Sequence, residues 1–102
     1  MSKPGDNLVR ALVDTHRVQL IKALLKKPQY ISQLADTVHL DRSTVSYNLA
    51  VLESAKIVES HYEILQEARS KGKAARVYKV NKARLKEVTD LVKPLQDLSG
   101  AG

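Results

Sequence analysis

The chain has 102 residues and a formal net charge of +6, which suits a single domain, residues 1–102, with a polyanionic partner. It contains no cysteine, which excludes disulfides, thiolate metal ligands and thiol redox sensing. Because no apolar run of 18 residues and no secretory signal occurs, we expect a cytoplasmic protein that does not contact the membrane.

Three helices are predicted in the first part of the chain. Asp6 is expected to cap the first of them, residues 6–14, in which apolar side chains recur at helical spacing. A second helix follows and ends at Pro28, because proline cannot continue it. Residues 30–31 favour a brief extended segment, after which Ser32 is expected to cap a short third helix.

The stretch 40–58 predicts a helix with two different faces. Asp41 is a good N-cap for it, and Val45, Leu49 and Leu52 share one apolar stripe at about 100° per residue. A solvated helix face is usually rich in Glu and Lys. The opposite face here has short polar side chains and one aromatic instead, so we expect it to be reserved for contact. The residues of this outer face are Ser43, Ser46, Tyr47 and Ala50.

From Ile57 the apolar residues recur at every second position, which predicts a β-hairpin over residues 57–80. Its turn contains Gly72, which permits a sharp reversal of the chain. Eight Lys and Arg residues and no Asp or Glu occur between residues 68 and 86, although the rest of the chain has a net negative charge. The basic residues expected at the tip of the hairpin are Arg69, Lys71, Lys73 and Arg76.

A last helix, residues 82–98, is predicted from an apolar seam that begins at Leu85. The order of elements describes a mainly α fold with a β-hairpin (α+β): a winged helix-turn-helix with four helices, a two-stranded wing and a C-terminal helix. Residues 32–55 are its helix-turn-helix. Helices 6–14 and 82–98 are expected to form a homodimer surface, the alternative being that their apolar residues only cover the monomer core. The residues assigned to this surface are Leu8, Leu12, Leu85, Val88 and Leu95.

Residues 34–58 read L-A-D-T-V-H-L-D-R-S-T-V-S-Y-N-L-A-V-L-E-S-A-K-I-V, which resembles the helix-turn-helix of the arsenic-repressor (ArsR-like) winged-helix regulators. The family pattern is roughly L-A-x-x-L-x-x-S-x-S-T-V-S-x-H-L-x-x-L-x-x-A-G-L-V, and the resemblance covers about residues 15–80. The sequence departs from it at His39 and Lys56, where glycines are common, and at Asn48, where His is frequent. It also lacks the family's cysteine metal motif and the ligand pairs of its last helix. The resemblance therefore implies a dimeric DNA-binding regulator that is not a metal sensor.

The dimensions of B-DNA suggest how such a helix acts. The first turns of a recognition helix reach base edges in the major groove, where hydroxyls donate or accept hydrogen bonds and Tyr47 contacts a thymine methyl or a phosphate. Arg42 could read guanine, but its place at the first position of the helix favours clamping the backbone. The basic wing is expected to lie on the backbone or in the minor groove. The helix residues expected at DNA are Arg42, Ser43, Thr44, Ser46 and Tyr47.

Structural explanations stay open for the same residues. Capping and helix solvation can explain the hydroxyls of Ser43, Thr44 and Ser46. Tyr47 can be held by a neighbouring side chain, and the basic hairpin can be a solvated loop or contact another anionic partner. For Asn48, which lies near the packed side of the helix, we favour a structural role.

We therefore predict a sequence-specific, double-stranded DNA-binding transcriptional regulator, and more narrowly a homodimeric repressor. No paired carboxylates, nucleophile motif or phosphate loop occurs, so we do not expect an enzyme. The three histidines, His16, His39 and His61, are spread along the chain, so neither a metal site nor a cofactor is expected. The alternative is a winged-helix protein-interaction module in a transcription or replication assembly, and single-stranded RNA binding is a weaker third option. The sequence names no effector.

Overall fold

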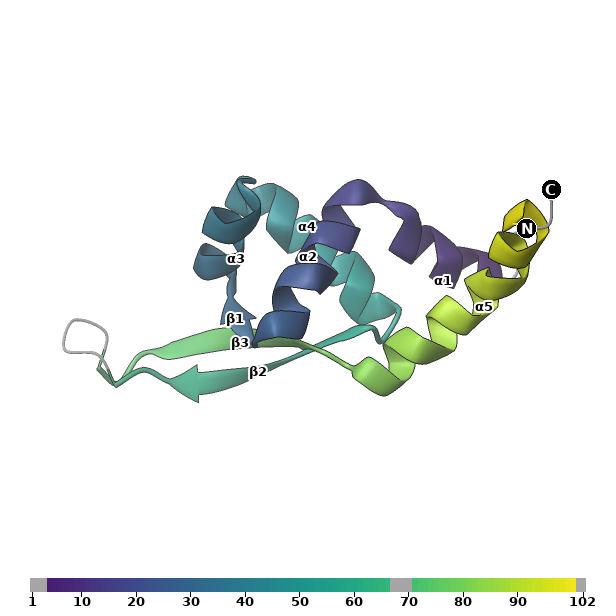
Figure 1. The fold of residues 1–102 in the computed structure, drawn as a ribbon. Coiled ribbons are helices and arrows are strands. Elements are labelled where there is room, and N and C mark those ends of the chain that lie inside the picture. Colours follow the sequence, from purple (N-terminus) through teal and green to yellow (C-terminus); the bar gives the residue numbers. More distant parts are fainter. Residues whose placement is uncertain (1–3, 67–70, 101–102) are drawn as a thin grey trace.

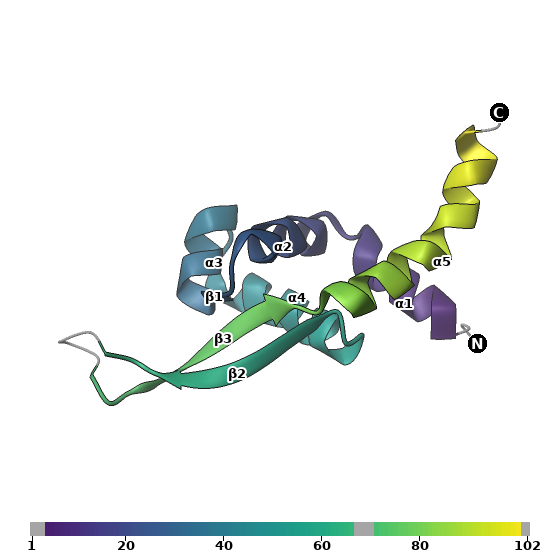
Figure 2. The same ribbon diagram turned by 60° about the horizontal axis from the view of Figure 1, so that its bottom comes forward.

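The structure is a computed structural model that describes the backbone of residues 4–66 and 71–100 and the side chains of residues 8–66 and 71–92. Helices dominate this part of the chain, and one long antiparallel hairpin extends from them (Figures 1 and 2). In chain order the elements are α1 (Pro4–Val13), α2 (Thr15–Lys26), β1 (Gln29–Tyr30), α3 (Ile31–Val38), α4 (Arg42–Ser54), β2 (Val58–Ile64), β3 (Ala74–Val80) and α5 (Lys82–Gly100). The predicted winged helix-turn-helix is confirmed.

The sheet has three strands in the order β1-β3-β2, whereas a hairpin of two strands was predicted. The brief extended segment expected at residues 30–31 is strand β1, which pairs with β3 so that Tyr30 lies opposite Val77. The Gln29 side chain is buried, and its Nε2 donates to the carbonyl of Ala23 over 3.0 Å. This bond fastens β1 to the end of α2, so the base of the wing is fixed to the helical part of the domain.

Two predicted helix starts are wrong. The first helix begins at Pro4 and not after Asp6, which agrees with the preference of proline for the first turn of a helix. The third helix begins at Ile31, so Ser32 lies inside its first turn instead of capping it. The backbone N–H of the preceding Tyr30 is accepted by the Gln33 side chain over 2.9 Å. The last helix reaches Gly100, two residues beyond the predicted 82–98.

Helices α2, α3 and α4 pack with the base of the hairpin around one hydrophobic core. The predicted stripe of α4, formed by Val45, Leu49 and Leu52, is fully buried in it. Burying one such side chain stabilises the fold by about 1.5–3 kcal/mol relative to leaving it exposed. The other fully buried large side chains are Leu20, Leu34, Ile57, Val58 and Val88. No helix in the described ranges combines the length and apolar composition that a membrane span requires.

Both helices of the helix-turn-helix end at a left-handed residue. His39 follows α3 with φ 57°, and Lys56 follows the end of α4 with φ 66°. The N–H group after the left-handed residue bonds back to the helix. After α3, Leu40 N–H donates to the carbonyl of Ala35 over 3.1 Å, which is a common way to end a helix. A side chain in this conformation costs roughly 1–2 kcal/mol, which explains why glycines are common at these two positions in the pattern that the sequence resembles.

Asp41 caps α4 as predicted. Its carboxylate accepts the hydroxyl of Ser43, the hydroxyl of Thr44 over 2.6 Å and the Thr44 N–H over 3.2 Å. These bonds, with that from the Ser43 hydroxyl the largest cause, lower the pKa of Asp41 from its usual 3.8 to about 2. The start of α4 is therefore defined by an anion that stays charged at all but very acid pH.

Replacing Asp41 with Asn keeps an acceptor at the cap and removes the titrating group. Because the folded pKa lies below the unfolded one, the carboxylate contributes stability that is fully present above pH 3.8 and is lost as the pH falls toward 2. We expect the Tm of the wild type to fall more steeply than that of Asp41→Asn across this interval, measured by circular dichroism. Parallel Tm profiles of the two proteins would contradict the assignment.

Candidate nucleic-acid interface

The outer face of α4 is exposed along its N-terminal half. Tyr47 is 67% exposed, and Ser43, Ser46 and Ala50 are exposed beside it. Thr44 is half-buried at the edge of this face. None of the side chains expected at DNA from this helix is packed inside the molecule.

Two of these side chains also have a structural role. The hydroxyls of Ser43 and Thr44 both donate to the Asp41 carboxylate, as the capping explanation requires. Their oxygens can still accept hydrogen bonds, but their protons are engaged. Within the described part of the chain, Arg42, Ser46 and Tyr47 have no side-chain hydrogen bond or ion pair to another residue. These three are the polar side chains of α4 most available to a ligand.

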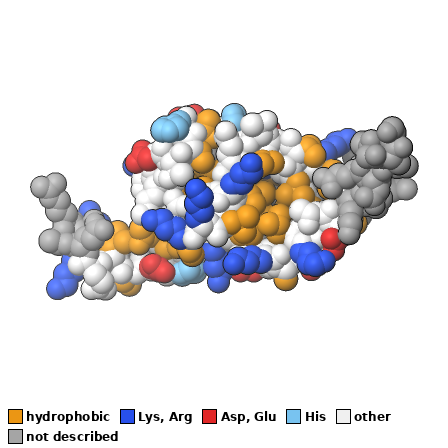
Figure 3. Space-filling model, in the orientation of Figure 1, with side chains coloured by type: hydrophobic (Ala, Val, Ile, Leu, Met, Phe, Trp, Pro, Cys, Tyr) orange, Lys and Arg blue, Asp and Glu red, His pale blue; other side chains and the backbone are white. Residues whose placement is uncertain are grey.

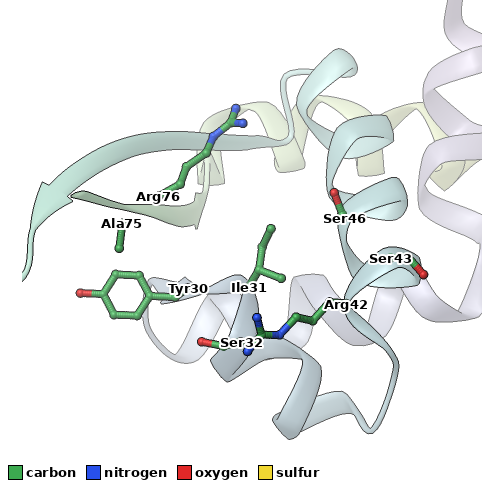
Figure 4. Close-up of a pocket in the computed structure, with 8 residues that line it drawn as sticks. All are labelled: Tyr30, Ile31, Ser32, Arg42, Ser43, Ser46, Ala75 and Arg76. Carbon is green, nitrogen blue, oxygen red and sulfur yellow. The ribbon is translucent and has the colours of Figure 1, made fainter. Parts of the chain in front are cut away.

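A hollow of about 510 Å³ lies beside α4, between the start of α3 and strand β3 (Figure 4). In Figure 4 the Arg42 side chain extends from α4 toward Ser32, while Arg76 comes from the opposite side. No carboxylate of the described residues lines this hollow. The residues that line it are Tyr30, Ile31, Ser32, Arg42, Ser43, Ser46, Ala75 and Arg76.

Residues 30–32 also line this hollow, although they were not predicted to belong to the site. They come close to the wing only because β1 pairs with β3, which brings Tyr30 opposite Val77. A two-residue strand has too short a pattern to be recognised from alternation. The extended segment expected at residues 30–31 was the available signal, but nothing in the sequence showed its partner strand.

A second hollow of about 510 Å³ lies on another side of the same helix, between α4 and the start of α2. It contains the carboxylate of Asp14, which caps α2 by accepting the N–H groups of His16 over 2.9 Å and Arg17 over 3.3 Å. No group of three possible metal ligands occurs among the described side chains of residues 8–66 and 71–92. The first turns of α4 thus stand between two hollows, and only the one near α2 has a described carboxylate in its lining.

Arg76 does not lie at the tip of the wing, and that expectation is wrong. It sits within β3 opposite Tyr62, three residues after the turn region ends at Lys73. Its Nε donates to Ser60 Oγ over 2.8 Å, and its Nη2 forms an ion pair with Glu53 Oε2 at 3.0 Å. The guanidinium also lies 5.2 Å from the centre of the Tyr78 ring. Arg76 therefore connects the wing to the last turns of α4.

The tip of the wing carries exposed Lys71 and Lys73 on either side of Gly72, which has φ 86°. The turn is closed by Leu65 N–H donating to the Lys73 carbonyl over 2.8 Å. The predicted contact residue Arg69 lies outside the described residues. Figure 2 shows the strands leading away from the helices, so the lysines lie far from the domain centre.

The helices expected to form a dimer surface, α1 and α5, lie side by side at the end of the molecule opposite the wing (Figure 1). Val88 is completely buried in the monomer core, as the alternative explanation holds, whereas Leu8, Leu12 and Leu85 are partly buried against that core. The side chain of Leu95 is outside the described residues.

Two exposed apolar side chains in these helices were missed: Val13 is 66% exposed and Leu91 is 47% exposed. An apolar hollow of about 400 Å³ adjoins Val13 between α1, α2 and α5, and Figure 3 shows apolar side chains on the face where α2 and α5 lie. Leu91 belongs to the apolar seam of the last helix, but its orientation could not be deduced without the position of α1.

Residues 14–60 match the family model described as "Bacterial regulatory protein, arsR family". No curated protein sequence matches the chain. A homodimeric winged helix-turn-helix DNA-binding domain from Mycobacterium bovis, a possible ArsR-family transcriptional regulator, is 20% identical with a TM-score of 0.65, covering 92% of this chain and 79% of that one.

Two further solved structures have the same fold. The transcriptional repressor BigR from Xylella fastidiosa is 21% identical with a TM-score of 0.63, covering 86% of this chain and 82% of that one. Diamide-treated YodB from B. subtilis is 16% identical with a TM-score of 0.72, covering 99% and 94%. The matched residues 14–60 extend from the cap of α2 to the start of the wing and include all of α4. Residues 14–60 therefore resemble the arsR family of bacterial regulatory proteins, and the described structure has the winged helix-turn-helix fold of these solved structures.

Proposed function

We propose that the protein is a homodimeric repressor that binds double-stranded DNA at a specific sequence. Helix α4 enters the major groove, and the wing contacts the adjacent backbone or minor groove. The observation that carries this proposal is the outer face of α4, where Arg42, Ser46 and Tyr47 are exposed and unengaged in the described structure. The major groove admits a helix, and short side chains allow the helix backbone to approach the bases closely.

The hollow between α3, α4 and β3 suits the backbone of one DNA strand. Arg42 supplies a cation, and the hydroxyls of Ser32 and Tyr30 supply hydrogen-bond donors. The first turn of α3 borders the same hollow, and its N–H groups favour an anion there. Tyr30 and Ser32 are thus added to the DNA contacts proposed from the sequence. They would contact phosphates, which position the protein on the duplex but do not read bases.

The wing supplies the second backbone contact through Lys71 and Lys73, together with the predicted Arg69. In the free protein the Arg76 charge is engaged by Glu53. We therefore propose that the main role of Arg76 is to hold the wing in place, and that a contact with DNA is secondary. Phosphate contacts of this kind supply affinity but little sequence information.

Dimerisation through α1 and α5 would present two copies of α4 to one face of the duplex, at half-sites about 34–36 Å apart. Support comes from the exposed Val13 and Leu91, since unpartnered apolar side chains of this size are common at interfaces. The dimer surface can still include Leu8, Leu12 and Leu85, which are only partly buried. Val88 is buried in the core and would not contact the partner directly. The similar M. bovis domain is described as homodimeric.

A second candidate is a protein-interaction module in a transcription or replication assembly. The observation favouring it is that Tyr62 and Ile64 are exposed on the same face of strand β2, so the wing presents apolar as well as basic side chains. An acidic protein partner would use both. Binding to duplex DNA with the salt dependence described next separates the two candidates.

The double variant Lys71→Ala/Lys73→Ala tests the wing contact. Titration of a duplex at several salt concentrations should give a log–log slope that is smaller by about 0.9 for each phosphate that the variant no longer neutralises, because each neutralised phosphate releases condensed counterions. Lys26→Ala/Lys27→Ala is the matched control, since it removes the same charge from two exposed residues at the end of α2. Equal slopes for the two double variants would show that the wing makes no special contact.

The substitutions Val13→Asp and Leu91→Asp test the dimer surface, because each would place a charge in the proposed apolar interface. Sedimentation at micromolar concentration should show a dimer for the wild type and a monomer for these variants. Leu25→Asp is the control, since Leu25 is 42% exposed on α2, outside the proposed surface. A wild type that is monomeric with and without DNA would refute dimerisation, and variants that remain dimeric would place the interface elsewhere.

A further inference from the structure

One guanidinium at the start of α2 connects three helices. Arg17 Nε donates to the carbonyl of Ala11 over 2.8 Å, and Nη2 donates to the carbonyl of Arg10 over 3.2 Å, both in the last turn of α1. Its third nitrogen, Nη1, donates to Oδ1 of Asn48 on α4 over 2.9 Å. The single side chain of Arg17 thus links the end of α1 to the middle of α4.

The geometry of this link leaves little freedom. A guanidinium is planar and holds its donors in a fixed fork, so the positions of its three acceptors are fixed relative to one another. Asn48 is only 4% exposed, and its Nδ2 donates to the carbonyl of Thr44 over 2.8 Å. Both ends of the Asn48 amide are therefore engaged, and α4 cannot rotate without breaking one of these bonds.

The two helices joined by Arg17 have different tasks in the proposed function, on which this inference rests. Helix α1 belongs to the proposed dimer surface, and α4 is proposed to read DNA. Only Asp14 separates α1 from α2 along the chain, so the backbone alone allows α1 to change its angle. The bonds of Arg17 to Arg10 and Ala11 resist that change, because they fasten the last turn of α1 directly to the helix-turn-helix.

We infer that Arg17 is a positioning residue that sets the angle between α1 and α4, and so the distance and orientation between the two recognition helices of the dimer. It contributes to specificity by fixing which half-site spacing the dimer accepts. Moving one half-site by one base pair shifts it by about 3.4 Å along the duplex and rotates it by about 35° around the axis. A dimer whose α1–α4 angle is fixed tolerates neither change.

The test uses Arg17→Lys, which keeps the charge but cannot reach three acceptors at once. Affinities are measured for a single half-site and for a series of palindromic duplexes in which the half-site separation changes by one base pair at a time. We expect the single half-site affinity to stay within about twofold of the wild type. The preference for the best spacing over its neighbours should fall about tenfold, the order of one hydrogen bond to a charged group.

Matched variants separate this role from a general loss of structure. Arg10→Lys makes the same chemical change at an exposed position in the last turn of α1 and should keep the wild-type spacing preference. Asn48→Ala breaks the α4 end of the link and should flatten the preference as Arg17→Lys does, with no further loss when the two are combined. Circular dichroism melts report whether each variant is folded.

The outcomes are distinct. A spacing preference in Arg17→Lys and Asn48→Ala as sharp as in the wild type would overturn the inference while leaving the proposed function intact. An equal loss at the single half-site and at every spacing would also overturn it, because that pattern indicates only a weakened fold. A wild type that binds duplex DNA without any preferred spacing would overturn the dimeric function and this inference together.

Discussion

The ion pair between Arg76 and Glu53, with Ser60 as a further acceptor, holds the wing against helix α4. Its partners are partly exposed, so it contributes only about 0.2–1 kcal/mol to stability. Its importance is geometric, because it joins strand β3 to the last turns of α4 at a point between the core and the tip. The proposed major-groove contact and the proposed backbone contact can then meet one duplex at the same time.

Near the proposed interface, the carboxylates have structural roles and several cations are left exposed. Asp14 and Asp41 are engaged as helix caps, and Glu53 is engaged by Arg76. Arg42 and the lysines at the wing tip have no such partner in the described structure. These three carboxylates near the proposed interface are therefore engaged by local bonds, whereas Arg42 and the two lysines keep their charges available to a polyanion.

The sequence predicted the parts of this site that depend on local pattern. The stripe of Val45, Leu49 and Leu52, the Asp41 cap and the existence of the hairpin all follow from local sequence, and the structure confirms them. The rest depends on contacts between residues distant in the chain. Arg17 bonds to Asn48 31 positions away, and Arg76 bonds to Glu53 23 positions away, so neither partner was recognisable without the packed helices.

The most direct test of the account is a methylation-interference experiment on the preferred duplex. Methyl groups at guanine N7 project into the major groove, and those at adenine N3 project into the minor groove. The account predicts that N7 methylation at the centre of each half-site blocks binding, while N3 methylation interferes only at the flanks where the wing lies. Interference confined to N3 throughout the site would contradict it, since α4 would then not be in the major groove.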